Sequence, residues 1–248
     1  MTSQRTSQVA SHTTVPPAAL DPTTSPADSP DLPVYQPTRW ALAGLGAGIA
    51  GVVAVVSAGM VSSVYDEDLA GDAPAIVEDL SDKVPAMLAF HLGAMVSAVL
   101  LVVFAAGLLR RLRATCGPDS LAPIVAFSGI LLTVVMLVMG AGLDTEFVFA
   151  ASDPDLVVAE NLTFYNHWIG TIPWCWGLLG LSGVALYGAA RAGAVPRWIG
   201  LVGLLGGGLT LLLGISPLQY MAGMTGPIGL IVISLGFLAG DKAFRGRA

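Results

Sequence analysis

Two of the three histidines in this chain lie in or beside apolar segments, where an ionisable side chain is costly to bury. His91 lies inside one such segment, and His167 opens another within the run 165–168. Ionisable residues in membrane segments usually mark ion paths, proton relays or cofactor sites. The two histidines are therefore the first candidates for chemistry.

A pair of histidines in membrane helices suggests haem b, with one imidazole bound to each side of the iron. His91 precedes the basic residue Arg110 by 19 positions, and His167 precedes Arg191 by 24. At about 1.5 Å per helical residue, the two histidines would differ in height by about 7 Å. Axial ligands need nearly equal heights, so a haem site using both histidines requires helix tilt or a kink at Pro173.

A divalent metal or proton site is a second possibility, because Asp144 and Glu146 leave an apolar segment on the same side of the membrane as the histidines. Carboxylate and imidazole together form a reasonable ligand set. The candidate ligands are His91, Asp144, Glu146 and His167. Residues two apart point about 200° away from each other on a helix, so both carboxylates reach one pocket only if the helix has already ended.

A simpler alternative is that each histidine lies at the membrane surface and forms a hydrogen bond with a neighbour. The surroundings of His167 favour this alternative, since aromatic residues form belts at membrane interfaces. The aromatic residues near it are Tyr165, Trp168, Trp174 and Trp176.

Other motifs for chemistry are incomplete. The acidic run 66–72 resembles a calcium loop, but Ala70 and Val77 stand where a ligand and the closing bidentate carboxylate belong. The sequence contains no paired-histidine zinc motif, phosphate-binding glycine loop or nucleophile elbow. Hydroxyl residues within the apolar segments are thin evidence for a transporter, because such groups mostly bond to their own helix; they are Ser128, Thr133, Ser182, Thr210 and Ser234.

The composition places these residues in a membrane protein. The chain has 248 residues, of which 54% are hydrophobic and 11% charged, and its mean hydropathy is +0.76. Six apolar stretches are each near the roughly 20 residues that a helix needs to cross a bilayer. We predict an all-α bundle of six transmembrane helices over 41–64, 86–109, 123–143, 168–190, 198–216 and 222–240.

The two ends of the chain differ from this domain. Residues 1–40 are rich in Ser, Thr and Pro and poor in bulky apolar side chains, which predicts a disordered tail. They lack the apolar core of a cleavable signal peptide, so we expect the first span to remain as an anchor. Residues 241–248 form a short basic tail.

The basic residues predict the orientation. With both termini in the cytoplasm, only Lys83 of the eleven basic residues lies outside, as the positive-inside rule requires. The predicted inner residues are Arg5, Arg39, Arg110, Arg111, Arg113, Arg191, Arg197, Lys242, Arg245 and Arg247. We therefore expect a multi-pass protein of a bacterial plasma membrane with two acidic outer loops.

The loops and glycines carry further structural signals. Ile76, Val77, Leu80 and Val84 recur at helical spacing, which predicts a short surface helix in the first outer loop. In the second outer loop, Asp153-Pro154 is typical of a helix start.

Glycines four apart allow close helix packing, either within one chain or in a homodimer; the pairs are Gly44 with Gly48, Gly203 with Gly207, and Gly236 with Gly240.

The segment 193–200, Gly-Ala-Val-Pro-Arg-Trp-Ile-Gly, precedes a glycine-rich span. It resembles the Gly-x-x-Pro-Arg-x-x-Gly motif between the fourth and fifth helices of a broad family of bacterial six-helix membrane proteins of unknown function. The resemblance covers roughly the second half of the chain. It implies a fold and a location, and it brings no activity with it.

These observations favour a non-enzymatic membrane protein with an accessory, sensing or partner-binding role. One alternative is a small-solute or proton-coupled transporter, and another is a haem- or metal-binding redox protein that uses His91 and His167. We expect its surroundings to be the lipid bilayer, its partner to be another membrane protein or a second copy, and no nucleic acid to bind.

Overall fold

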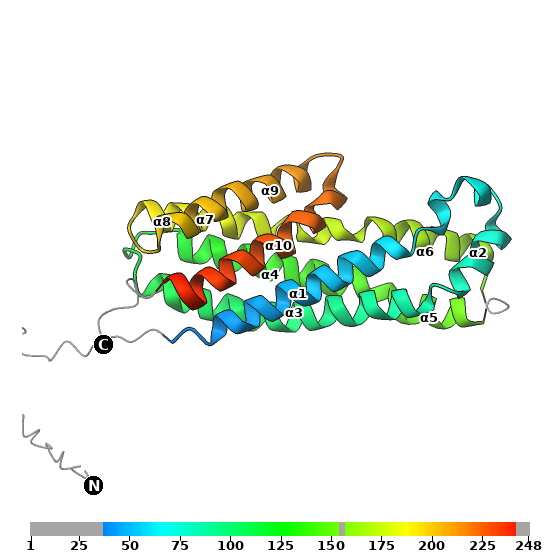
Figure 1. The fold of residues 1–248 in the computed structure, drawn as a ribbon, viewed down its shortest axis with the longest axis horizontal. Helices are drawn as coiled ribbons and strands as arrows, with labels where there is room; N and C mark the ends of the chain where they lie inside the picture. Colours follow the sequence, from blue (N-terminus) through cyan, green and yellow to red (C-terminus); the bar gives the residue numbers. More distant parts are fainter. Residues whose placement is uncertain (1–36, 154–156, 242–248) are drawn as a thin grey trace, which may run out of the picture. The chain divides into compact units, whose positions relative to one another are not determined.

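The computed structural model describes residues 37–153 and 157–241. Within these residues all regular structure is helical, and six helical segments are long and apolar enough to cross a membrane (Figure 1). The predicted all-α, six-span fold is confirmed. Most of the predicted N-terminal tail, all but the first residue of the basic C-terminal tail, and Pro154 lie outside the described residues.

The spans are built as follows. The first is α1 (Trp40–Met60) and the second is α3 (Val84–Arg113). The third joins α4 (Ala122–Gly140), the 3₁₀ turn Ala141–Leu143 and α5 (Asp144–Ser152). The fourth joins α6 (Ala159–Thr171), the 3₁₀ segment Ile172–Trp176 and α7 (Leu179–Arg191). The fifth joins α8 (Arg197–Val202), the π-helical turn Gly203–Gly207 and α9 (Gly208–Ile215), and the sixth joins Gln219–Met221, α10 (Ala222–Leu235) and the π-helical turn Gly236–Gly240.

The outer faces of these helices are apolar. Exposed large hydrophobic side chains occur along the spans, as expected where lipid replaces water around the protein. Examples are Ile49, Val56, Leu92, Val99, Val135, Leu205 and Leu212. The chain is therefore built as a multi-pass membrane protein.

Charge divides the bundle into two ends. All arginines of the described residues lie at the end where α1 begins and α3 and α7 finish, which we call the basic end. The opposite end, which we call the acidic end, carries α2 (Ala73–Ser81), α5 and α6 (Figure 1). Its carboxylates are Asp66, Glu67, Asp68, Asp72, Glu78, Asp79, Asp82, Asp144, Glu146, Asp153 and Glu160.

The third and fourth spans are longer than the sequence predicted. They contain 31 and 33 residues, Ala122–Ser152 and Ala159–Arg191, instead of ending at 143 and beginning at 168. At about 1.5 Å per residue they exceed a hydrocarbon core of about 30 Å. Hydropathy identifies only the part that crosses hydrocarbon, so it missed the polar helical extensions α5 and α6.

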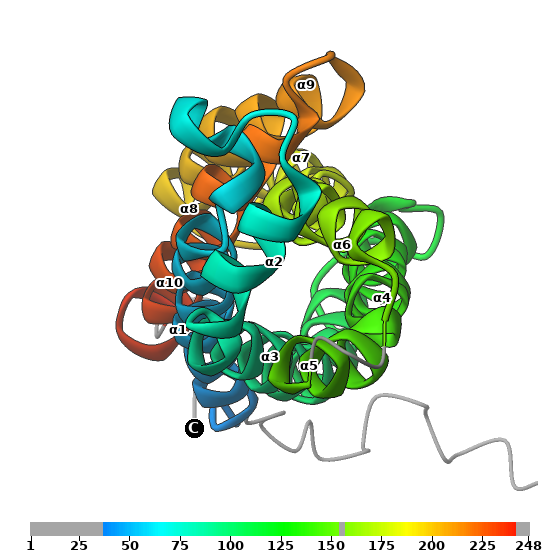
Figure 2. The same cartoon turned by 90° about the vertical axis from the view of Figure 1, so that its right-hand side faces the viewer.

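These extensions, the first two turns of α3 and the segment that contains α2 form a folded cap at the acidic end. We call residues 61–91, 144–153 and 157–171 the acidic cap (Figure 2). The predicted helix in the first loop is confirmed as α2, and Asp72 caps it by accepting a hydrogen bond from the Ala75 amide at 3.2 Å. Its apolar face does not lie on a surface: Ile76, Val77 and Leu80 are buried, and α2 contacts α5 and α6.

Glycines allow α7 and the fifth span to touch through their backbones. A Cβ atom at Gly203 would lie 2.5 Å from the Gly183 carbonyl oxygen, and one at Gly207 would lie 2.7 Å from the Gly183 Cα atom. The other two predicted pairs are also occupied within the chain, because Gly44 and Gly48 meet Phe104 and Ile231. Gly236 and Gly240 both pack against Trp198. The glycine pairs therefore serve helix packing inside one chain.

A buried ion pair holds the basic end together. Arg111 Nε donates to Asp241 Oδ2 and Arg111 Nη2 donates to Asp241 Oδ1, both at 2.9 Å, and the two side chains are 1% and 0% exposed. Nη1 also donates to Thr115 Oγ1 at 2.8 Å. Buried charges need such complete pairing, because each loses its hydration. Sequence reasoning had placed Arg111 among ordinary inner basic residues.

Segment 193–200 supplies one of the hydrogen bonds that Arg111 makes. Gly193 ends α7 with φ +77°, and the amides of Gly193 and Ala194 donate to the carbonyls of Ala190 and Ala189 at 3.1 and 2.9 Å. This is a Schellman C-cap, in which glycine avoids the strain that a side chain would cause. The Ala194 carbonyl then accepts a hydrogen bond from Arg111 Nη2 at 3.3 Å.

The glycine contact between α7 and the fifth span gives a first prediction. In Gly183→Ala, the new methyl group would lie 2.5 Å from the Gly203 carbonyl oxygen, so backbone atoms must move and the bundle should lose about 1–3 kcal/mol. Gly188→Ala is the matched control, since no atom lies within 4 Å of a Cβ at that position of the same helix. Thermal unfolding in one detergent, followed by circular dichroism, should give a lower midpoint for Gly183→Ala than for Gly188→Ala. Equal midpoints would contradict this packing.

Candidate functional site

A histidine, an aspartate and a tyrosine from three helices meet in the acidic cap. His91 Nδ1 of α3 lies 3.1 Å from Asp144 Oδ2 of α5, and the Tyr165 hydroxyl of α6 donates to Asp144 Oδ1 at 2.9 Å. The Asp144 side chain is 1% exposed and that of His91 is 30% exposed. The carboxylate is thus enclosed, while the imidazole connects it to the surroundings.

The local backbone explains why Asp144 faces inward. The 3₁₀ turn Ala141–Leu143 joins α4 to α5, and Asp144 is the first residue of α5. Glu146, two residues later, is exposed, as the angle between successive helical positions requires. Only one of the two predicted carboxylates therefore reaches the site.

Neighbouring side chains fix the positions of Tyr165 and the chain around it. The Phe147 ring stacks on the Tyr165 ring with centroids 4.6 Å apart and planes 10° apart. Asn166 is fully buried and connects α6 to the segment after α1 by hydrogen bonds. It donates to the Val61 carbonyl and accepts from the Val64 amide at 2.8 Å. A buried side-chain amide whose oxygen and nitrogen are both hydrogen-bonded holds two segments in one relative position, because any displacement leaves polar atoms unpaired.

His167 lies apart from this network. Its side chain is exposed, and its ring meets the Tyr65 ring edge-on with centroids 5.6 Å apart. Burial and the nearby Tyr220 raise the pKa of Tyr65 above its ordinary value. The structure therefore brings His91 and Asp144 together and gives His167 and Glu146 separate surroundings.

The bond between His91 and Asp144 joins two groups that can each hold a proton. With the proton on Nδ1, His91 donates to Asp144 and presents Nε2 as an acceptor. Metal-binding histidines often have such a carboxylate partner, but they need further ligands. Within residues 37–153 and 157–241, no three His, Cys, Asp or Glu residues are grouped as a metal site would require.

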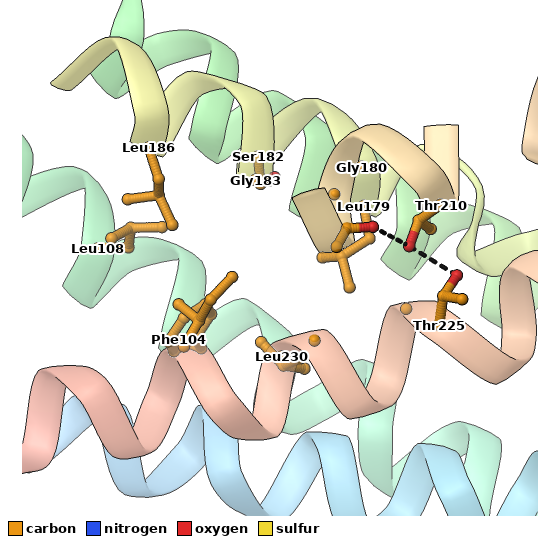
Figure 3. A pocket seen from close by; sticks show the side chains of 15 residues that line it. Phe104, Leu108, Leu179, Gly180, Ser182, Gly183, Leu186, Thr210, Thr225 and Leu230 are labelled. Atoms are coloured by element: carbon orange, nitrogen blue, oxygen red, sulfur yellow. Dashed lines mark hydrogen bonds between the residues drawn. The ribbon is translucent and has the colours of Figure 1, made fainter. Parts of the chain in front are cut away.

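A cavity of about 30 Å³ lies among α3, α7, α9 and α10, with room for one or two water molecules (Figure 3). Its lining is largely apolar, and its polar feature is a bond of 2.8 Å between the hydroxyls of Thr210 and Thr225. Thr210 also donates to its own helix at Gly206, and Ser182 donates to the Ala126 carbonyl of α4.

Sequence reasoning missed the roles of Tyr165 and Asn166. Tyr165 had been assigned to an interfacial aromatic belt, although the run contained a usable signal. Leu162, Tyr165, Asn166 and Ile169 follow helical spacing and form the buried face of α6. A polar residue on that face indicates a bonded interior position.

Comparisons with known protein families, with characterised proteins and with solved structures find no match to this chain.

The enclosed carboxylate gives a second prediction. Tyr165→Phe removes one of the donors to Asp144 while keeping the ring stacked on Phe147, so the protein should lose about 1–3 kcal/mol of stability. Tyr220→Phe is the control, because Tyr220 is an exposed tyrosine at the same end. Unfolding midpoints in detergent should fall for Tyr165→Phe and stay unchanged for Tyr220→Phe. A Tyr165→Phe variant as stable as wild type would show that the hydroxyl is not needed by Asp144.

Proposed function

We propose that this chain is a non-enzymatic sensing protein of a bacterial plasma membrane, with both termini in the cytoplasm and the acidic cap outside. The distribution of charge supports this orientation, because the described arginines lie at the basic end and Lys83 lies at the acidic end. The resemblance of segment 193–200 to a family of bacterial six-helix membrane proteins supports the same location. The signal we propose is the external proton concentration.

The observation that carries this proposal is the bond between a partly exposed imidazole and an enclosed carboxylate. Histidine is the side chain that commonly changes charge between pH 5 and 8. Protonation of His91 would convert the hydrogen bond from a neutral imidazole to the Asp144 carboxylate into an ion pair between two opposite charges, which is stronger. The contact between α3 and α5 would then depend on external pH.

The surroundings of His91 make this response local and specific. Asp144 comes from α5 and Tyr165 from α6, while the described sequences of α1 and α4 contain no titratable residue. On the neighbouring α2, Asp79 accepts a bond from Ser63 and lies 3.8 Å from Lys83. Asp144 is thus the charged group bonded to His91.

α3 offers a route for the response to cross the membrane. It is one continuous helix that contains His91 near its start and Arg111 near its end. Arg111 in turn holds Asp241, which directly follows the sixth span, and the turn after α7. A change in the tilt of α3 at the cap would therefore alter the geometry of the buried ion pair between Arg111 and Asp241 at the basic end.

The described residues give less support to the two alternative functions, a transporter and a haem- or metal-binding redox protein. A transporter needs a path for its substrate, whereas two cavities among the described spans are small, about 30 Å³ in Figure 3 and about 120 Å³ between α4, the fourth span and α9. The buried hydroxyls of Ser97, Thr133 and Ser182 bond to backbone carbonyls. A haem site would need His91 and His167 on one iron, and the two rings have different partners. We therefore propose neither.

Tryptophan fluorescence tests the proposal. Trp168 is a suitable reporter, since its indole donates to the Gly140 carbonyl at 2.9 Å, one helical turn before Asp144. In lipid nanodiscs, the emission of wild type should change in one step between pH 8 and pH 5, and His91→Gln should abolish this step. His167→Gln, which alters an exposed histidine on the same side, should retain it.

Two results would refute the sensing role. One is an unchanged pH response in His91→Gln, and the other is a wild-type spectrum that does not vary over this pH range. If only His167→Gln lost the step, the pH response would belong to His167 and not to His91.

A further inference from the structure

A cavity of about 330 Å³ lies between α7 and α8 at the basic end of the bundle. It is lined by Tyr187, Ala190, Arg191, Arg197 and Leu201, and its size is within the range of small-ligand pockets, about 300–1,000 Å³. It lies at the opposite end of the bundle from the acidic cap. The proposed sensing role does not use it.

The lining residues converge as two pairs with helical spacing. Tyr187 and Arg191 are four residues apart on α7, and Arg197 and Leu201 are four apart on the fifth span. In each pair the arginine is nearer the end of its span and the uncharged residue is one turn deeper. The two guanidinium groups therefore project from the span ends, with Tyr187 and Leu201 one helical turn closer to the bilayer centre.

Tight packing keeps the two helices in this arrangement. A Cβ atom at Gly200 would lie 2.3 Å from the Ala190 Cβ and 3.3 Å from the Tyr187 Cα. The Schellman turn at Gly193 brings the chain back between the helices. The positions from which the two arginines project are thus set by the backbone.

The arginines lack an anionic partner within the described part of the chain. No carboxylate of residues 37–153 or 157–241 forms an ion pair with Arg191 or Arg197, and both side chains are exposed. Arg111, at the same end, is by contrast buried and paired with Asp241. Two unpaired guanidinium groups around one cavity have the charge and geometry to bind phosphate oxygens.

We propose that this cavity binds the headgroup of an anionic phospholipid. Arg191 and Arg197 would hold the phosphate, and the half-buried Tyr187 would offer its hydroxyl. Lipid is the occupant that the location favours, because both arginines stand at the ends of membrane spans and exposed apolar residues continue below them. Leu201, Leu205 and Val184 supply that surface for an acyl chain. Basic pockets between transmembrane helices bind anionic headgroups in this way.

Lipid retention tests the site. Wild-type protein would be reconstituted in nanodiscs of phosphatidylcholine and phosphatidylglycerol at about four to one, released into mild detergent, and its bound lipids counted by native mass spectrometry. Phosphatidylglycerol should be retained in preference to phosphatidylcholine. Arg191→Gln with Arg197→Gln should reduce this preference about tenfold, whereas Arg191→Lys with Arg197→Lys should keep part of it.

The control is Arg110→Gln with Arg113→Gln, which removes two exposed arginines from the same end but outside this cavity and should leave the preference unchanged. Each single glutamine variant should lose about threefold, which preserves the comparison if the double variant misfolds. Equal retention in the glutamine and wild-type proteins, or equal loss in the control, would overturn the proposal. The proposal would also be overturned if inorganic phosphate alone stabilised wild type as much as phosphatidylglycerol does, because the site would then bind a free anion.

Discussion

An enclosed carboxylate must have its oxygens satisfied by the protein, and Asp144 imposes this requirement on the acidic end. His91 of α3 and Tyr165 of α6 supply the contacts, so three helices are tied to one side chain. Phe147 and Asn166 then fix α6 against α5 and against the segment after α1. Burial of this one group therefore joins α3, α5 and α6 at the acidic end.

The opposite end solves the same problem with a different pair. Arg111 and Asp241 are both buried, and the Ala194 carbonyl and Thr115 hydroxyl complete the bonding of the guanidinium. Between these two polar clusters, glycines let the helices approach closely, and hydroxyl groups such as Ser97 bond to backbone carbonyls. The bundle is thus fastened at its two ends and packed by shape in the middle.

The sequence predicted most of the fold, because apolar length and the helical spacing of Ile76, Val77 and Leu80 are local signals. It could not predict that α5 and α6 continue the third and fourth spans, since polar helical turns outside the hydrocarbon lower the hydropathy. At the site, the shared side of His91 and Asp144 was readable. Their bond and the role of Tyr165 depend on how the helices are rotated, which hydropathy does not give. The ion pair of Arg111 with Asp241 joins residues 130 positions apart, so no local signal could predict it.

Cysteine labelling across the membrane most directly tests the claim that the acidic cap faces outward. Asp68→Cys at the acidic end and Asp119→Cys at the basic end, both exposed positions, would be placed separately in a chain with Cys116→Ser and Cys175→Ala. In intact cells, a membrane-impermeant maleimide should label the cysteine at 68 and reach the cysteine at 119 only after lysis. Labelling at 119 and protection at 68 in intact cells would contradict the account, because His91 and Asp144 would then face the cytoplasm.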